Sequence, residues 1–240
     1  MGYKNLIDKV VEAAYDYKYL LSRGYPIKSS LDLVVSRYLL SKHERLLLFR
    51  CIHSNKYVEE ISKKLVCTKL NEYNLVLDFY NVIISTINML KGGEVYLCDD
   101  CVPRDLRGSK LRSDDYVYIP KALKIITQVI EALEPKQVIA VVDKDVSHSL
   151  EHAFSLYLEL KSTGIKYSYE LTSTPDSKII SYSKSDCRCV VASTDSLVMT
   201  RSLRVAPLTF YIMNVLKVDP IYNFVQVFDS KCSICSDKFV

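Results

Sequence analysis

The spacing of apolar positions divides the chain into two parts, of which the first reads as helical. In residues 4–22 apolar side chains recur at helical spacing, and Arg23-Gly24 ends the pattern. Ser41 and Glu44 form a capping-box pattern at the start of another helical run. Short connections separate the further helices predicted after the first one, at 25–40, 41–52 and 57–65. Short connections and apolar faces are typical of a compact bundle.

The pattern changes after the segment 68–73, where we place a domain boundary. Short β-rich runs now alternate with helical ones, which predicts a mainly parallel sheet with helices on both faces. The β-rich runs are 74–78, 94–98, 137–142, 165–170, 188–192 and 203–206. The helical runs are 120–134, 147–164 and 208–217. We therefore expect an α/β protein with an all-α helical bundle at 1–70 and a three-layer α/β/α domain at 71–240.

Composition favours a soluble globular protein. Apolar residues make up 49% of the 240 residues and charged residues 25%. No apolar run reaches the roughly 18 residues that a membrane span requires. Residues 1–21 mix charges with apolar side chains and lack a small-residue cleavage site, unlike a signal peptide. We expect a cytoplasmic protein that does not contact a membrane. The net charge of +4 is too small to indicate a nucleic-acid-binding tail.

Aspartates follow several of the predicted strands. They are Asp78, Asp99 with Asp100, Asp143 and Asp195. Because the carboxyl ends of parallel strands meet at one edge of a sheet, we expect these side chains to converge. Several close carboxylates repel one another unless a cation lies among them. Oxygen ligands without histidine suit Mg²⁺ or Mn²⁺ better than zinc. The alternative is that each aspartate only caps a helix or starts a turn.

Asp78 interrupts the apolar run NLVLDFYNVII, residues 74–84, and Asn81 follows three residues later. Burying an unpaired carboxylate costs on the order of several kcal/mol. A position at the carboxyl end of a strand avoids that cost because the sheet edge is open. Asn81 is then a candidate to orient Asp78, or an attacking water, by hydrogen bonding.

A basic loop follows Asp99-Asp100. Its cations are Arg104, Arg107, Lys110 and Arg112. Beside an acidic pocket such a loop would hold the phosphates of a polyanion. The alternative is a surface loop whose arginines pair with neighbouring acids, which are Asp105, Asp114 and Asp115.

The segment VVDKDVSHSLEHAF places small hydroxyl residues at a predicted helix start. Ser147 or Ser149 would cap this helix, whose N-terminus could bind a phosphate. His148 and His152 are four residues apart and share a helix face, but the HExxH metalloprotease pattern is absent.

Two cysteine pairs have CxxC spacing, Cys98/Cys101 and Cys232/Cys235. Two such pairs can bind zinc, but these lie much further apart in the chain than in a zinc ribbon. Separate thiols or a local disulfide are the favoured interpretation, and zinc at Cys232/Cys235 is the alternative.

Several motifs together resemble a known family. The segment DYKYLLSRGYPIKSSLDLVVSRYLLSKHERLLLFRCI resembles the N-terminal helical domain of an uncharacterised, mostly archaeal family classed as a domain of unknown function. LVLDFYNVII, DDCVPRDLRGS, DKDVSHS and ASTDSLVM resemble the domain that follows it. This second part is also similar to the PIN-like fold, including its NYN branch. Asp78 with Asn81 matches the first-strand motif of that branch, and Asp195 with Ser196 its late motif. Phe79 replaces a usual glycine.

The resemblance implies a Mg²⁺- or Mn²⁺-dependent ribonuclease, a hydrolase of RNA phosphodiester bonds. The implied metal ligands and catalytic residues are Asp78, Asn81, Asp100, Asp143 and Asp195, with Asp99 as the substitute for Asp100. The phosphate-binding candidates are Arg104, Arg107, Lys110, Ser147 and Ser196. The helical domain would recognise a structured RNA or a protein partner.

Three alternatives remain. The chain is a non-catalytic RNA- or protein-binding module that keeps the fold, or a phosphatase acting on small molecules, or its helical domain binds DNA as a helix-turn-helix. A phosphatase would need a DxD-type motif on the first strand, which Asp78-Phe79-Tyr80 does not supply.

Overall fold

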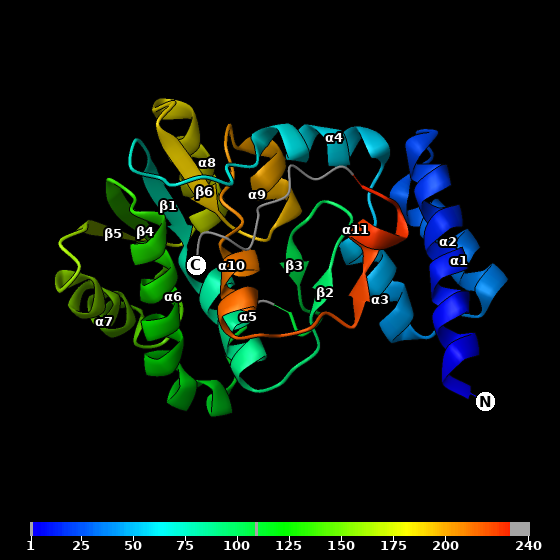
Figure 1. Cartoon of the computed structure of the whole chain (residues 1–240), viewed down its shortest axis with the longest axis horizontal. Coiled ribbons are helices and arrows are strands. Elements are labelled where there is room, and N and C mark those ends of the chain that lie inside the picture. Colours follow the sequence, from blue (N-terminus) through cyan, green and yellow to red (C-terminus); the bar gives the residue numbers. More distant parts are fainter. Residues whose placement is uncertain (1, 109, 231–240) are drawn as a thin grey trace.

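The computed structural model describes residues 2–108 and 110–230. An N-terminal helical region comes first, as predicted, and lies at one end of the long axis of the molecule (Figure 1). Its helices are α1 (Gly2–Ser22), α2 (Ile27–Tyr38), α3 (Lys42–Cys51) and α4 (Asn55–Lys64). The predicted capping box starts α3: the Ser41 hydroxyl accepts from the Glu44 N–H, and the Glu44 carboxylate accepts from the Ser41 N–H.

A four-stranded parallel sheet forms the centre of the second part. Its strands are β1 (Asn74–Asp78), β4 (Gln137–Asp143), β5 (Lys166–Thr172) and β6 (Cys189–Ala192). They lie in the order β5-β4-β1-β6. The chain therefore builds outward from β1 through β4 to β5 and then returns to the other side of β1. The mixed α/β fold and the mainly parallel sheet are confirmed.

Helices cover both faces of this sheet, since alternate residues of each strand point to opposite sides. Leu75 and Leu77 belong to a core with α5 (Phe79–Leu90), α6 (Ile119–Leu133), α7 (Ser149–Lys161) and α10 (Leu208–Val215). Val76 belongs to a smaller core that includes Ile179 of α8 and Val198 of α9. These two helices are α8 (Pro175–Ser185) and α9 (Ser196–Arg201).

Two predicted strands are wrong in part. Of the run 94–98, only Tyr96–Leu97 is a strand, β2, and it lies in a separate small sheet with β3 (Pro103–Arg104) and β7 (Tyr222–Asn223). The chain turns directly after it, and Cys101 adopts a left-handed φ of 72°. The run 203–206 is not a strand, although Val205 makes isolated bridges to neighbouring segments.

Two of the longer helices were missed. The apolar run 79–90 is α5, which begins directly after Asp78 and is buried along nearly its whole length. An all-round buried helix has no polar face, so its sequence lacks the amphipathic period that reveals a surface helix. The second missed helix is α8, which begins at Pro175.

The helical region packs directly on the rest of the chain. Its core cluster includes Tyr96 and Cys98 of the small sheet region and Phe224 of α11 (Phe224–Val227). A short 3₁₀ helix, Ser113–Tyr118, leads into α6. Within residues 2–108 and 110–230, no helix has both the length and the apolar character that crossing a membrane requires.

Candidate active site

Asp78 lies at the point where the strand order of the sheet reverses. It ends β1, and the loop after β6 runs beside it. The Ser193 hydroxyl from that loop donates a hydrogen bond of 2.6 Å to Asp78 Oδ2. In open parallel sheets such a reversal leaves a crevice at the carboxyl ends of the strands, where ligands bind.

Other acidic side chains lie near Asp78. Burial raises the pKa of Asp78 to about 7, the Ser193 hydrogen bond opposes this shift, and the charges of Asp176 and Asp195 add to it. Burial also raises the pKa of Asp176, and the charges of Asp195 and Asp143 raise it further. These aspartates therefore form one interacting acidic group, which we call the edge cluster: Asp78, Asp143, Asp176 and Asp195.

Asp195 caps a helix as well as joining the edge cluster. Its Oδ1 accepts from the backbone N–H groups of Leu197 and Val198, at 2.8 and 3.0 Å, at the start of α9. Its own N–H donates to the Ser193 hydroxyl, which in turn donates to Asp78. The capping alternative therefore holds for Asp195, and the cap fixes the position of its carboxylate.

Sequence reasoning missed Asp176. It stands in the first turn of α8, which follows β5, so each of the four parallel strands sends an acid toward this edge. The segment Thr174-Pro175-Asp176 carried a usable signal, since proline at the first helical position and an acid in the first turn mark a helix start. Asp143 ends β4, and its Oδ1 accepts from the Asp145 N–H at 2.9 Å.

The donor set of the edge cluster fits a hard divalent cation. All its ligand atoms are carboxylate oxygens, which Mg²⁺ and Mn²⁺ prefer. Among the described residues, no three of these carboxylates have ligand atoms within 4.8 Å of one another. Mg²⁺ commonly keeps several waters and takes only one or two carboxylates. The spacing therefore suits an ion held by a pair of aspartates and water, not a closed cage of protein ligands.

Asn81 does not bond to the Asp78 side chain through its carboxamide. Asn81 Oδ1 accepts from both the N–H and the hydroxyl of Thr194, at 2.8 and 3.0 Å. Arg104 Nε donates to the Thr194 carbonyl at 2.8 Å. Asn81 and Arg104 thus hold the β6–α9 loop, which carries Ser193 and Asp195, from two sides.

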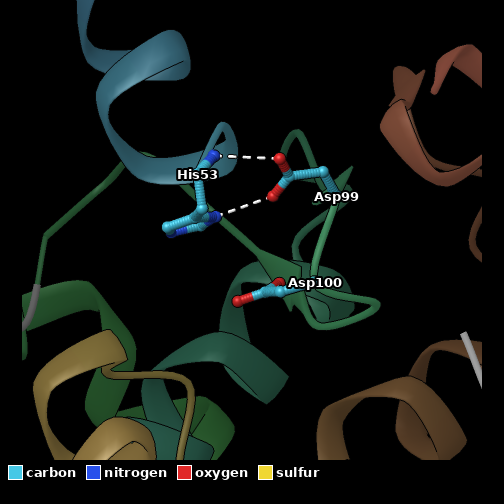
Figure 2. Close-up of side chains that lie close together, drawn as sticks. All are labelled: His53, Asp99 and Asp100. Carbon is cyan, nitrogen blue, oxygen red and sulfur yellow. Dashed lines mark hydrogen bonds and ion pairs between the residues drawn. The ribbon is translucent and has the colours of Figure 1, made fainter. Parts of the chain in front are cut away.

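Asp99 and Asp100 do not join the edge cluster, because β2 lies outside the main sheet. Together with His53 they form the one group of ligand types within 4.8 Å that the described residues contain (Figure 2). Figure 2 shows Asp99 facing His53, whose Nδ1–H and backbone N–H bond to it at 2.7 and 2.9 Å. The Asp100 carboxylate makes no bond to either residue.

Both carboxylates already have cations. The Lys18 ammonium lies 2.6 Å from Asp99 Oδ2. Arg104 binds both oxygens of Asp100, at 2.8 and 2.7 Å. Burial alone would raise the pKa of Asp100, but Arg104 and His53 hold it below its usual value. We interpret this group as a neutralised ion-pair network between the helical region and the β2–β3 turn, not as a metal centre.

The basic loop follows the alternative in which its arginines pair with nearby acids. Arg104 is buried and fully engaged, so it is not available to a phosphate. Both Nη atoms of Arg107 bond to Asp115. Lys110 is exposed. Of the loop's phosphate-binding candidates, Lys110 alone is presented to solvent.

The remaining candidates lie at helix starts. Ser147 is exposed, and it does not cap α7: the N-cap position is His148, in a left-handed conformation, without a side-chain cap. Ser149 is buried in the first turn. Ser196 is exposed at the start of α9, next to Asp195.

The two bulky residues after Asp78 have structural roles. Phe79 is buried in the main core. The Tyr80 hydroxyl bonds to His152 Nδ1 at 3.0 Å. Burial lowers the pKa of His152, and the charge of His148 lowers it further. His152 is therefore a neutral partner that satisfies a buried tyrosine.

The two cysteines of the first CxxC pair differ in state. Cys98 is a buried free thiol, whereas Cys101 is disulfide-bonded, as is Cys67. The proposed zinc alternative at Cys232/Cys235 lies outside the described residues.

A cleft of about 570 Å³ separates the edge cluster from the helical region. Thr194, Asp195 and Ser196 line it together with Arg104. His53 lines it as well, held by Asp99 and stacked on the Tyr57 ring at 4.3 Å. Of the edge cluster, Asp195 thus lines a cavity whose other wall is helical.

Known proteins match this chain in two segments. Residues 67–211 match the family described as "Domain of unknown function (DUF5616)", and residues 9–64 match "Protein of unknown function (DUF434)". An uncharacterised protein of Methanocaldococcus jannaschii, MJ0935, is 33% identical over 143 residues, which are 58% of this chain and 67% of the relative. No solved structure matches the chain.

Proposed function

This chain belongs to the family described as "Domain of unknown function (DUF5616)", and we propose that it is a Mg²⁺- or Mn²⁺-dependent nuclease with a PIN-like fold that hydrolyses RNA. One observation carries the proposal. Acids that follow all four parallel strands interact near the reversal point of the sheet, where burial first, and then the charges of Asp176 and Asp195, raise the pKa of Asp78 to about 7.

Asp78 and Asp195 are the proposed metal ligands, with Asp143 and Asp176 beside them. A bound divalent ion would neutralise charge on a phosphate and supply an activated water. The chain's own residues fix the geometry. Ser193 bonds to Asp78 and to the Asp195 backbone, so it couples the two carboxylates.

Asn81 and Arg104 act as positioning residues in this proposal. They hold Thr194, the residue between Ser193 and Asp195. Asp100 acts through Arg104, since its carboxylate binds the guanidinium bidentately. Lys110 and Ser196 remain the exposed candidates for holding substrate phosphate.

Cleavage of a labelled RNA in the presence of Mn²⁺ tests the proposal. Asp78→Asn and Asp195→Asn each remove one charge from the edge cluster and preserve side-chain shape. We expect each to lower the cleavage rate at least about 10²-fold, as for the loss of a residue that stabilises transition-state charge. Asp219→Asn, at an exposed position after α10, is the matched control and should cleave like the wild type. Undiminished cleavage by both edge variants would refute the assignment.

A second candidate is a non-catalytic RNA- or protein-binding module. The observation that favours it is the pairing of Asp99 and Asp100 with Lys18 and Arg104, which removes two expected metal ligands. This candidate predicts salt-dependent RNA binding without metal dependence and without cleavage by the wild type. The same assay with and without Mn²⁺ separates the two candidates.

A further inference from the structure

A groove extends from the edge cluster across the helical region. Its first part is the cleft of about 570 Å³, and an adjoining cavity of about 520 Å³ continues it between α2 and α3. The two cavities share the side chains of Ile27, Leu46 and Phe49. A continuous path therefore runs from Asp195 at one end to the α2 and α3 surface at the other.

Cations line the groove and acids are scarce. Its cationic lining residues are Lys28, Lys42, Arg45 and Arg50, besides Arg104, which is already paired with Asp100. Among the described residues that line either cavity, Asp195 is the single acid. Arg45 pairs with Asp32, but its Nη1 is buried without a hydrogen-bond partner. The groove thus presents the positive charges of Lys28, Lys42 and Arg50, and Asp195 of the edge cluster lies at its other end.

Aromatic rings line the groove as well. Tyr25 is 58% exposed and Phe49 is 52% exposed, although large apolar side chains gain free energy when they are buried. Arg50 directly follows Phe49 and lines the same cleft. Exposed rings beside cations are how proteins bind single-stranded nucleic acid: bases stack on the rings, and phosphates contact the cations.

We propose that this groove binds a single-stranded polynucleotide. Bases stack on Tyr25 and Phe49, and the backbone follows Lys42 and Arg50. The strand then reaches Asp195, a direction that rests on the proposed nuclease function, whereas binding itself does not. A duplex keeps its bases stacked inside and cannot offer them to the rings. An acidic or apolar protein segment is the competing occupant, and the exposed rings that line the groove together with its cations favour the polynucleotide.

The test measures binding of fluorescent 12-nucleotide single strands of RNA and DNA, in EDTA so that no strand is cleaved. Phe49→Ala should weaken binding by about 5- to 150-fold, the range for loss of one stacked base. Arg50→Ala should lower the slope of log K against log salt by about 0.7, the value for one phosphate contact on a single strand. Both side chains are partly exposed, and thermal unfolding verifies that each variant is folded.

Matched controls lie on the opposite part of the molecule. Phe154→Ala removes a half-exposed ring from α7, and Lys124→Ala removes an exposed cation from α6. Both should bind like the wild type. Equal affinity for RNA and DNA assigns recognition to bases and phosphates, and tighter binding of RNA adds its 2′-hydroxyl.

Three outcomes overturn the inference: no binding by the wild type at low salt, equal binding by Phe49→Ala and the wild type, or duplex RNA bound as tightly as the single strand. The two proposals fail separately. Groove-dependent binding by a protein that never cleaves RNA refutes the nuclease and keeps the groove. If Phe49→Ala and Arg50→Ala cleave RNA like the wild type, the nuclease proposal stands and the groove proposal is refuted.

Discussion

Two groups of aspartates follow strands in this protein, and their surroundings differ in one respect. Asp78 is 8% exposed and Asp100 is 1% exposed, so burial penalises both charges. Yet the pKa of Asp78 is raised to about 7, whereas the pKa of Asp100 is lowered. Asp78 has the acids Asp176 and Asp195 near it, and Asp100 has the guanidinium of Arg104.

The comparison shows what separates a candidate metal site from a structural ion pair. Burial alone cannot separate them, because both Asp78 and Asp100 are buried. The charge of the neighbours decides: a carboxylate with its own arginine needs no further cation, while carboxylates that face one another gain from one. The pair Asp99 and Asp100 therefore joins the helical region to the rest of the chain. The carboxylates of the edge cluster remain available to bind a cation.

The largest expected effect concerns the ion pair. Arg104→Met leaves the buried carboxylate of Asp100 without its cation and removes a bond to the Thr194 carbonyl. We expect the free energy of unfolding to fall by about 3–5 kcal/mol, as for other buried pairs broken on one side. Urea denaturation followed by circular dichroism measures it.

The double variant Asp100→Leu with Arg104→Met is the control for that change. It removes both charges, and replacing a buried pair with apolar side chains is often neutral. The double variant should therefore be more stable than Arg104→Met alone. A loss below about 1 kcal/mol in the single variant would mean that Arg104 does not compensate the charge of Asp100, and the contrast with Asp78 would then disappear.

The fold was predictable where a strand is apolar on both faces or a helix is apolar on one face. Residues 74–78 read as a strand, and α6 as a helix with one apolar face. The run 79–90 did not reveal α5, because a helix buried all round has no polar stripe. The run 94–98 resembled a sheet strand, but only tertiary pairing determines which sheet a short β-rich segment joins.

The edge cluster was predictable in part for a similar reason. Aspartates directly after strands, such as Asp78 and Asp143, follow from strand positions alone. Asp176 lies in a helix that the pattern did not indicate, so its membership was invisible. Lys18, which neutralises Asp99, was equally invisible because it lies 81 positions away, whereas Arg104 stands only four positions after Asp100.

The second prediction uses a metal ion to distinguish the edge cluster from the group formed by His53, Asp99 and Asp100. Mn²⁺ at about 100 times its dissociation constant should raise the free energy of unfolding by about 2.7 kcal/mol, because it binds the folded state alone. Asp195→Asn should abolish this gain, and His53→Gln should keep it. Thermal unfolding with and without Mn²⁺ measures this gain for each variant. If His53→Gln loses the gain and Asp195→Asn keeps it, the metal binds at His53, Asp99 and Asp100 instead.

The smallest expected effect is the contribution of Asp78 to the pH dependence of stability. Its folded pKa of about 7 lies above the ordinary value of 3.8, so between these values the folded state binds more protons than the unfolded state. This contribution to stability is complete below about pH 4 and is lost as the pH rises through about 7. Without metal, Asp78→Asn should therefore match the wild type near pH 5 and exceed it by about 1–2 kcal/mol near pH 8.5. Urea titrations at the two pH values measure the difference between the variants, which cancels the titration of other groups.

Saturating Mg²⁺ should remove the wild type's loss at high pH, since the ion takes the place of the proton. If the two proteins show parallel pH profiles, Asp78 carries a dedicated counter-charge like Asp100, and the edge cluster loses its distinction from the ion pair.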